Sequence, residues 1–209
     1  MRYRNCTTLC VPYPDKRMTK ATYSDKALVV DILAKSFAEN RSVNYIIKQD
    51  RKKISRLKRL MEYSFDTCFT YGEIILSDDR KGCALIIFPE KKRTTLKSIL
   101  SDVKLIISST DISNALKAMQ RESAIMKVQP KELIYYLWFI GVDTTEQNKG
   151  IGTRLMQEII DHSFALKKII CLETSTTKNI PWYQQFGFTI YNELDFGYRL
   201  YCLKKDLPK

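Results

Sequence analysis

Histidine is almost missing from this sequence. His162 is the only one among 209 residues, so no site built from two or three histidine ligands can form. A Ser-His-Asp or Cys-His nucleophile system would have to use that same residue. No Cys-x-x-Cys pair occurs, which argues against zinc ribbons and thioredoxin-like chemistry, although six cysteines are present: Cys6, Cys10, Cys68, Cys83, Cys171 and Cys202. The composition therefore predicts no metal site.

Long hydrophobic runs are also missing. The first residues lack the apolar run of a signal peptide. The longest apolar stretch, Leu133 to Val142, has 10 residues, whereas a membrane-spanning helix needs about 20. We therefore expect a cytoplasmic protein with reduced cysteines and no membrane partner.

Positive charge, by contrast, is plentiful. Lysine and arginine number 35 against 23 acidic residues, which gives a net charge of +12. This excess favours a polyanionic partner, which could be nucleic acid, an acidic membrane or a phosphate-rich cofactor. A basic helix face over residues 48–59 is most simply a solvated surface. A nucleic-acid or ribosomal role for that face is the sharper alternative.

Hydrophobic spacing predicts the order of elements. Residues 1–20 contain two prolines and little periodicity, so we expect an irregular arm there. Apolar spacings of three and four predict helices over 25–38, 48–65, 94–107, 111–127, 151–165 and 180–186. Apolar and β-branched runs predict strands over 73–77, 83–88, 133–142, 168–173, 188–192 and 198–203. Helices mixed with strands indicate an α+β fold with a mixed sheet.

A glycine pair marks a candidate phosphate site. The segment Gln147-Asn-Lys-Gly-Ile-Gly152 lies between the strand ending at Val142 and the helix 151–165. Unpaired N–H groups and the positive end of the helix dipole meet at such a junction, which is a phosphate-binding geometry. Neither the Walker A pattern nor the three-glycine dinucleotide pattern is present. On these residues alone, a tight strand-to-helix turn remains open as the alternative.

Three motifs in series resemble one superfamily. Gln147-x-x-Gly150-x-Gly152 is similar to the Q/R-x-x-G-x-G/A signature of the GNAT acetyltransferases. Leu172-Glu-Thr-Ser175 and the stretch from Asn179 to Phe188 look like the second half of that family's core, and most resemble its puromycin N-acetyltransferase-like branch. The resemblance implies a mixed, mostly antiparallel sheet with a splayed parallel strand pair, flanked by helices. It also implies one acetyltransferase domain over 1–209, with a helical insert at 89–130 and an acetyl-CoA-binding core at 133–203.

The resemblance implies a set of residues that bind acetyl-CoA. The strand before the loop would contact the pantetheine arm, the loop amides would hold the pyrophosphate, and Asn179 would contact the arm near the short helix. The expected cofactor-binding residues are Ile140, Gly141, Val142, Gln147, Asn148, Lys149, Gly150, Ile151, Gly152, Thr153, Asn179 and Tyr183.

Two residues are candidates for catalysis. In the family, a tyrosine at the position of Tyr183 protonates the departing thiolate, and a phenol stays protonated at neutral pH. Its alternative role is packing on the sheet. Glu173 is a candidate base for the amine, with a water chain or a structural role as alternatives. His162, late in the cofactor helix, is expected to be a solvated surface residue.

The acceptor side carries no motif. By resemblance, the insert at 89–130 and the first two helices would line the acceptor pocket; the candidate lining residues are Tyr45, Phe69, Tyr71, Met119 and Met126. The sequence thus predicts an acetyl-CoA-dependent N-acetyltransferase whose partner is a small-molecule primary amine. A protein N-terminus or lysine is the alternative acceptor, and a non-catalytic nucleic-acid-binding module is the least favoured reading.

Overall fold

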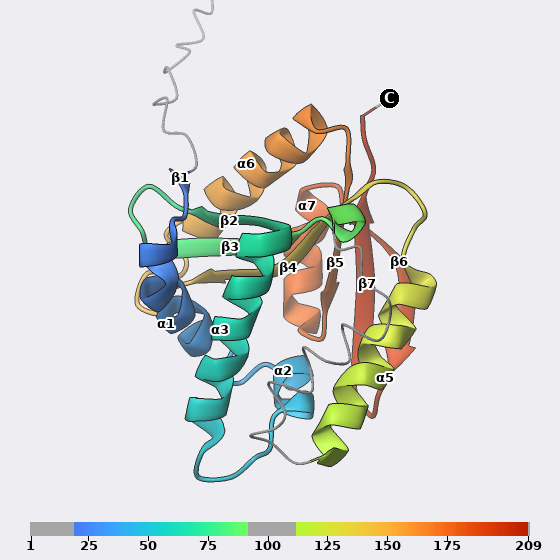
Figure 1. Cartoon of the computed structure of the whole chain (residues 1–209). Coiled ribbons are helices and arrows are strands. Elements are labelled where there is room, and N and C mark those ends of the chain that lie inside the picture. The colour runs from blue at the N-terminus through green and yellow to red at the C-terminus, as the bar shows by residue number, and fades with distance from the viewer. Residues whose placement is uncertain (1–18, 92–111, 209) are drawn as a thin grey trace, which may run out of the picture.

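A mixed β-sheet forms the centre of the molecule in this computed structural model, which describes residues 19–91 and 112–208 (Figure 1). Within these residues the sheet has seven strands in the order β1-β2-β3-β4-β5-β7-β6. Only β4 and β5 run parallel. The strands are β1 Thr19–Lys20, β2 Gly72–Leu76, β3 Gly82–Ile87, β4 Ile134–Val142, β5 Ile169–Thr174, β6 Thr189–Asp195 and β7 Arg199–Lys205. The predicted mixed α+β fold, mostly antiparallel with one parallel pair, is confirmed.

Helices cover both faces of this sheet (Figure 1). They are α1 Lys26–Ser36, α2 Arg41–Ile46, α3 Lys53–Tyr71, α5 Ile112–Val128, α6 Ile151–Ala165 and α7 Ile180–Gln185, with short 3-10 turns at Tyr23–Asp25, Pro89–Lys91 and Thr177–Asn179. Helices α1 and α3 pack on one face, and α6 and α7 pack on the other. No described helix is long and apolar enough to span a membrane.

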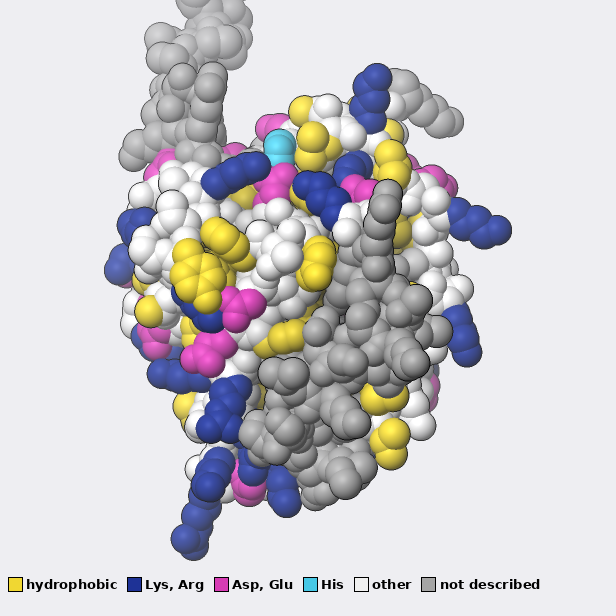
Figure 2. All heavy atoms as spheres, viewed as in Figure 1, with side chains coloured by type: hydrophobic (Ala, Val, Ile, Leu, Met, Phe, Trp, Pro, Cys, Tyr) yellow, Lys and Arg dark blue, Asp and Glu magenta, His cyan; other side chains and the backbone are white. Residues whose placement is uncertain are grey.

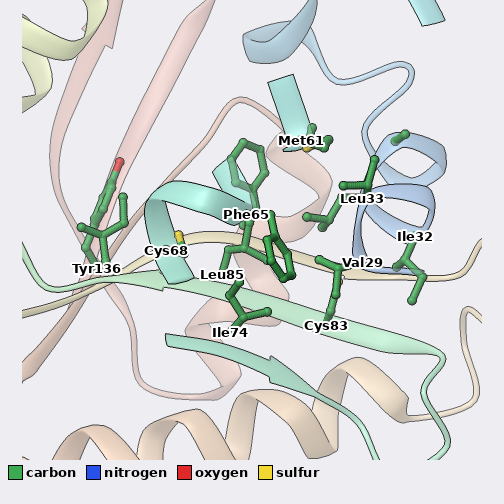
Figure 3. Close-up of a cluster of buried hydrophobic side chains, with 14 of the residues drawn as sticks. Val29, Ile32, Leu33, Met61, Phe65, Cys68, Ile74, Cys83, Leu85 and Tyr136 are labelled. Carbon is green, nitrogen blue, oxygen red and sulfur yellow. The ribbon is translucent and has the colours of Figure 1, made fainter. Parts of the chain in front are cut away.

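Each face has its own hydrophobic core. The core under α1 and α3 contains Leu33, Phe65 and Leu85, all fully buried (Figure 3). The core under α6 and α7 contains Met156 and Ile170, which are also fully buried. Alternate residues of a strand point to opposite faces, so the same central strands supply both cores.

Close contact between α1 and β4 depends on Gly141. A Cβ at this position would lie 2.9 Å from Leu33 Cδ2 and 3.2 Å from Ser36 Oγ. The Ser36 hydroxyl donates a hydrogen bond of 2.7 Å to the carbonyl of Val142. Helix α1 is therefore fastened to the end of β4, just before the glycine-containing loop.

The sequence predicts most elements to within a few residues, and the helix over 151–165 is confirmed at both ends. The helix predicted over 48–65 is partly wrong, because α3 begins at Lys53 and ends at Tyr71. Asp50 explains the late start, since its side chain and carbonyl accept hydrogen bonds from the amides of Lys52 and Lys53. Helix α2, capped by the Asn40 side chain, is not predicted from the sequence.

Two further predictions concern the irregular arm at 1–20 and the helical insert at 89–130. Residues 19–20, expected to be irregular, pair with β2 as β1. The rest of the arm, Cys6, Cys10 and the helix predicted over 94–107 lie outside the described residues. The second predicted helix of the insert is present as α5. The other four cysteines are buried free thiols.

Two irregularities affect β4 in the middle of the sheet: a bulge opposite β3 and a short parallel pairing with β5. Leu85 and Ile86 on β3 face Phe139 and Leu137, so Trp138 is an extra residue on β4. Such a bulge turns the side chains that follow it. The parallel pairing of β4 with β5 covers only three residue pairs and ends at Tyr136 and Cys171. Beyond that point the two strands diverge, and a gap is left between them.

Candidate active site

Two adjoining cavities occupy the gap between β4 and β5. The outer cleft, of about 630 Å³, lies between the end of β4, the start of α6 and α7. The inner cavity, of about 110 Å³, lies between the middle of β4, the end of β5, α2 and α5. The two share one wall, made of Phe37, Asn40, Ile140, Thr176, Asn179 and Tyr183. The two cavities therefore adjoin at this wall.

The start of α6 presents backbone donors to the outer cleft. Gly150 caps the helix with φ +79°, a left-handed conformation that favours glycine. The first bond within the helix is donated by the Arg154 amide to the Gly150 carbonyl, so the preceding amides of α6 have no helical acceptor. These amides and the helix dipole together make an anion-binding site.

Most of the predicted cofactor-binding residues gather around this cleft. Those that line it are Ile140, Gly141, Val142, Gln147, Asn148, Ile151, Gly152, Thr153, Asn179 and Tyr183. Lys149 and Gly150 are not among its lining residues. The Lys149 ammonium instead forms an exposed ion pair of 2.8 Å with Glu146. Gly150 sets the direction of the chain without lining the cleft.

The outer cleft has room for a phosphate-bearing group beside Gly152. A Cβ added there would lie 3.6 Å from Val142 Cγ2 and 3.8 Å from Trp182 Cζ2, which is ordinary contact distance. A larger side chain at this position would extend into the cleft that Gly152 lines. The open cradle, the free amides and the unpaired edge of β4 beyond Tyr136 fit the pyrophosphate and pantetheine arm of acetyl-CoA.

Tyr183 lies in the shared wall. The residue is only 6% exposed, and its ring packs edge-on against Trp182 and Phe188, at centroid distances of 5.0 and 5.8 Å. Burial raises the pKa of the phenol, which therefore keeps its proton throughout the neutral range. Tyr183 packs on its neighbours, which is the alternative role considered from the sequence. It also lines both cavities.

Glu173 lies in the inner cavity at the end of β5. Its Oε2 accepts a short hydrogen bond from the Tyr136 hydroxyl. Its Oε1 is buried and has no hydrogen-bond partner within the described part of the chain. Burial raises the pKa of this carboxyl to about 7, although Tyr136 and Arg121 act in the opposite direction. A group with this pKa can take up and release a proton at neutral pH.

Sequence reasoning missed the charged wall of the inner cavity. Arg121 and Glu122 on α5 form an ion pair of 2.6 Å and line this cavity together with Tyr136. The Arg121 Nε also donates to the hydroxyl of Tyr198, at 3.3 Å. The odd-even alternation of β4 could have placed Tyr136 beside Glu173, but no sequence signal brings α5 to this point.

The acceptor-lining residues proposed from the sequence are wrong. None of Tyr45, Phe69, Tyr71, Met119 and Met126 lines either cavity. Phe69 and Met126 are exposed by 46% and 47%. Besides Tyr136 and Tyr183, the aromatic residues that line the inner cavity are Phe37, Trp138 and Phe139. Trp138 and Phe139 are neighbours at the bulge of β4, and their ring centroids lie 5.3 Å apart.

His162 is not the solvated surface residue that the sequence suggests. Its Nδ1 lies 3.2 Å from the hydroxyl of Tyr135, and its side chain is only 26% exposed. The Tyr135 phenol is buried between α6 and the sheet, where it needs a polar partner. The ring of His162 supplies that partner.

The basic segment over 48–59 lies on the surface. Figure 2 shows Lys and Arg side chains projecting from the lower edge of the molecule, where Figure 1 places the start of α3. Lys53 and Arg56 form ion pairs with Glu39 and Asp50. Arg51 and Lys58 are exposed, as expected of a solvated helix face.

Comparison with known proteins agrees with this architecture. Residues 120–188 match the family described as "Acetyltransferase (GNAT) family". The segment includes the Gln147–Gly152 loop, α6, β5 and α7, which form the outer cleft and part of the inner cavity.

Solved structures of known acetyltransferases share the fold. Arylalkylamine N-acetyltransferase 2 from Aedes aegypti superposes with a TM-score of 0.68 at 14% identity, covering 93% of this chain and 100% of that chain. A Corynebacterium glutamicum protein described as histone acetyltransferase HPA2 and related acetyltransferase superposes with a TM-score of 0.66 at 17% identity. The match covers 93% of this chain and 97% of that chain. The polyamine N-acetyltransferase of Drosophila melanogaster superposes with a TM-score of 0.58 at 12% identity. The match covers 92% of this chain and 100% of that chain. Residues 120–188 are thus similar to the GNAT acetyltransferase family, and the chain shares the fold of these solved structures.

Proposed function

We propose that this protein is an acetyl-CoA-dependent N-acetyltransferase that acetylates a primary amine of a small molecule. The observation that carries the proposal is the wall shared by the two cavities. On one side of it, free backbone amides at the start of α6 suit a pyrophosphate. On the other side, Glu173 offers a buried carboxyl that titrates near neutral pH. Tyr183 borders both cavities.

The outer cleft would hold acetyl-CoA. The amides of the first turn of α6 would bind the pyrophosphate, and Thr153 and Gln147 line the same cleft. The pantetheine arm would lie along β4 where that strand has left β5, beside Ile140 and Asn179. When bound there, acetyl-CoA supplies the thioester carbon that an amine can attack.

Glu173 would act as the base in the inner cavity. An ammonium group cannot attack a carbonyl until it loses a proton. The free Oε1 of Glu173 would accept that proton, and the neutral nitrogen would then form the new C–N bond as the C–S bond breaks. The amide nitrogen gives up one more proton to solvent. A water chain remains the alternative route for the first proton.

Tyr183 would act as the acid. Its phenol would donate its proton to the departing sulfur, so that CoA leaves as a thiol, and solvent would then return a proton to the tyrosine. The high pKa that burial gives this phenol keeps it in the protonated form that the step requires. General acids of this kind contribute roughly 100- to 10,000-fold to the rate of a reaction.

A small acceptor suits the inner cavity. An apolar cavity of about 150 Å³ holds a benzene molecule, so the present volume of about 110 Å³ admits only a small group. Its aromatic lining and its two carboxylates suit an amine on a short apolar chain. The similar fold of arylalkylamine and polyamine N-acetyltransferases supports this choice. The resemblance to the puromycin N-acetyltransferase-like branch stays a prediction.

Ligand binding and turnover test the proposal. Thermal unfolding is measured with acetyl-CoA, CoA, ATP, NAD and a short RNA at low and moderate salt. Release of CoA thiol is then followed with arylalkylamines, polyamines, aminoglycosides, puromycin and a peptide with a free N-terminus. We expect a salt-tolerant rise in midpoint with acetyl-CoA, and thiol release with one class of small amine.

A pair of charge variants in one helix controls for unspecific effects. Gly152→Glu places a carboxylate in the outer cleft, and like charges brought together there should weaken acetyl-CoA binding by about 100-fold. Gln157→Glu adds the same charge on the exposed face of α6 and should leave binding unchanged.

Stabilisation by RNA alone, lost at moderate salt, would favour the nucleic-acid module. Turnover with the peptide alone would favour a protein acceptor.

A further inference from the structure

The Glu173 carboxyl is held asymmetrically. Tyr136 and Cys171 are paired across β4 and β5, and Glu173 follows Cys171 by two residues on the same face of β5. This register brings the Tyr136 hydroxyl to Oε2 of Glu173, while Oε1 stays without a partner among the described residues. Figure 3 shows Tyr136 at the edge of the hydrophobic cluster, apart from the other labelled side chains.

The second group near this carboxyl is Arg121, a buried guanidinium on α5. Its positive charge lowers the pKa of Glu173, as does the hydrogen bond from Tyr136, whereas burial and the charge of Glu122 raise it. The side chain is only 12% exposed. A buried charge of this kind is costly unless it is paired, and replacing it with an apolar group is often neutral for stability. Arg121 and Glu173 line the same inner cavity.

The other titratable groups near Glu173 carry no charge at neutral pH. They are Tyr191 on β6, Cys171 on β5 and Cys202 on β7. Burial raises the pKa of each thiol to about 12 and raises the pKa of the Tyr191 phenol as well. Among the described residues, Arg121 and Glu122 are therefore the charged neighbours that can set the protonation of Glu173.

We propose that Tyr136 and Arg121 are positioning residues for Glu173: the Tyr136 hydroxyl fixes one carboxylate oxygen and the Arg121 charge offsets its burial, so that the other oxygen is left to receive a proton from the acceptor ammonium. This inference rests on the proposed function. It adds a role for α5, which carries none of the acetyltransferase motifs. Helix α5 supplies the charge that keeps the buried base ionisable.

Both groups stabilise the carboxylate form of Glu173, but only Tyr136 also fixes its orientation. The Tyr136 hydroxyl donates to Oε2 and so stabilises the carboxylate form and its orientation. The Arg121 charge stabilises the same form through space. The Arg121 guanidinium is itself held by Glu122 and by the hydroxyl of Tyr198, which in turn donates to Ser42 Oγ at 3.2 Å. Tyr198 therefore contacts Arg121 without contacting Glu173.

The experiment measures the protonation of Glu173 directly. Carbon-13 labelled glutamate side chains are titrated by NMR in the full-length protein, and the Glu173 signal is assigned by its loss in Glu173→Gln. The variants are Tyr136→Phe, Arg121→Met, Arg121→Lys and the matched control Tyr198→Phe, each checked for folding by circular dichroism. The pH profile of kcat/KM for acetyl transfer is measured on the same variants.

We expect a midpoint near pH 7 in the wild type. Tyr136→Phe should raise it by about one to two pH units, because a hydrogen bond to a charged group is lost. Arg121→Met should raise it by about one unit, and Arg121→Lys should keep it close to the wild-type value. Tyr198→Phe should leave it unchanged. In the pH profile, Tyr136→Phe should recover most of its rate above the raised midpoint, whereas a purely structural defect would lower the rate at every pH.

Several results would overturn the proposal. A Glu173 midpoint that stays within a few tenths of a unit in folded Tyr136→Phe refutes the positioning role, and this variant decides alone if Arg121→Met does not fold. An equal shift in Tyr198→Phe would assign the effect to general packing. The NMR midpoint does not depend on turnover. Absent turnover with shifted midpoints would therefore refute the proposed function, and unshifted midpoints with intact turnover would refute only the positioning role.

Discussion

The outer cleft and the inner cavity differ in how the chain builds them. Half of the residues that line the outer cleft belong to one continuous stretch, from Ile140 through the loop to Thr153, and the others come from residues 36–40 and 176–183. The inner cavity is assembled from α2, α3, α5, β4 and β5, which are far apart in the sequence. The candidate cofactor side is therefore built around one local stretch, whereas the candidate acceptor side is wholly a product of tertiary packing.

The two cavities also differ in chemistry. Backbone amides and glycines shape the outer cleft, so its character depends on conformation more than on side-chain type. Side chains that titrate or carry charge shape the inner cavity. The following experiments test this division.

The largest effect is expected at the wall that both cavities share. Tyr183→Phe removes only the phenolic hydroxyl, which we assign to proton donation. We expect kcat to fall by about 100-fold or more, with little change in acetyl-CoA affinity. Steady-state kinetics and calorimetric titration measure the two quantities. Tyr45→Phe, whose hydroxyl lines neither cavity, is the control, and normal turnover by Tyr183→Phe would remove the tyrosine from the mechanism.

In the inner cavity, Glu173→Gln tests the burial of the carboxyl through stability. The folded-state pKa of about 7 lies above the ordinary value, so ionisation opposes folding as the pH rises towards 8. At pH 5 the folded carboxyl is protonated and the cost is small. The variant should therefore gain stability over the wild type between pH 5 and pH 8, on the order of 2 kcal/mol.

Denaturant unfolding at the two pH values measures this gain. Glu62→Gln, which replaces an exposed carboxyl on α3, is the control and should show no comparable trend. A stability difference between Glu173→Gln and the wild type that does not vary with pH would show that Glu173 is not desolvated in the folded chain.

At the junction of the outer cleft with α1, Gly141→Ala tests close packing. The new methyl group would meet Leu33 and Ser36 at 2.9 and 3.2 Å, so the leucine must move. We expect a loss of about 1 kcal/mol and a melting temperature lower by a few degrees. Gly152→Ala adds the same methyl group where nothing lies closer than 3.6 Å and should not lower the melting temperature. Equal losses in both variants would contradict the packing argument.

The smallest effect is expected at Lys149. The sequence resemblance places this residue among the cofactor contacts, whereas in the structure its ammonium pairs with Glu146 and does not line the cleft. We expect Lys149→Ala to change acetyl-CoA affinity by less than about threefold, because exposed ion pairs contribute little. A loss of tenfold or more, measured by calorimetric titration, would return Lys149 to the cofactor site.

Several features of the fold can be read from the sequence because they depend on neighbouring residues. The periodicity of 151–165 predicts α6 at both ends, since one apolar face of that helix packs on the sheet. The two glycines and the preceding strand predict the turn that leads into it. Helix α2 escapes prediction because six residues carry too little pattern, and its start depends on the side chain of Asn40.

The sequence by itself determined the outer cleft, the order of elements and the candidate acid Tyr183, because short motifs and local hydrogen bonds specify them. Only the tertiary structure decided the inner cavity. The bulge at Trp138 changes which side chains face it, and the packing of α5 brings Arg121 next to Glu173, residues 52 positions apart in the sequence. Burial in that cavity, which no local pattern encodes, is what moves the pKa of Glu173 into the neutral range.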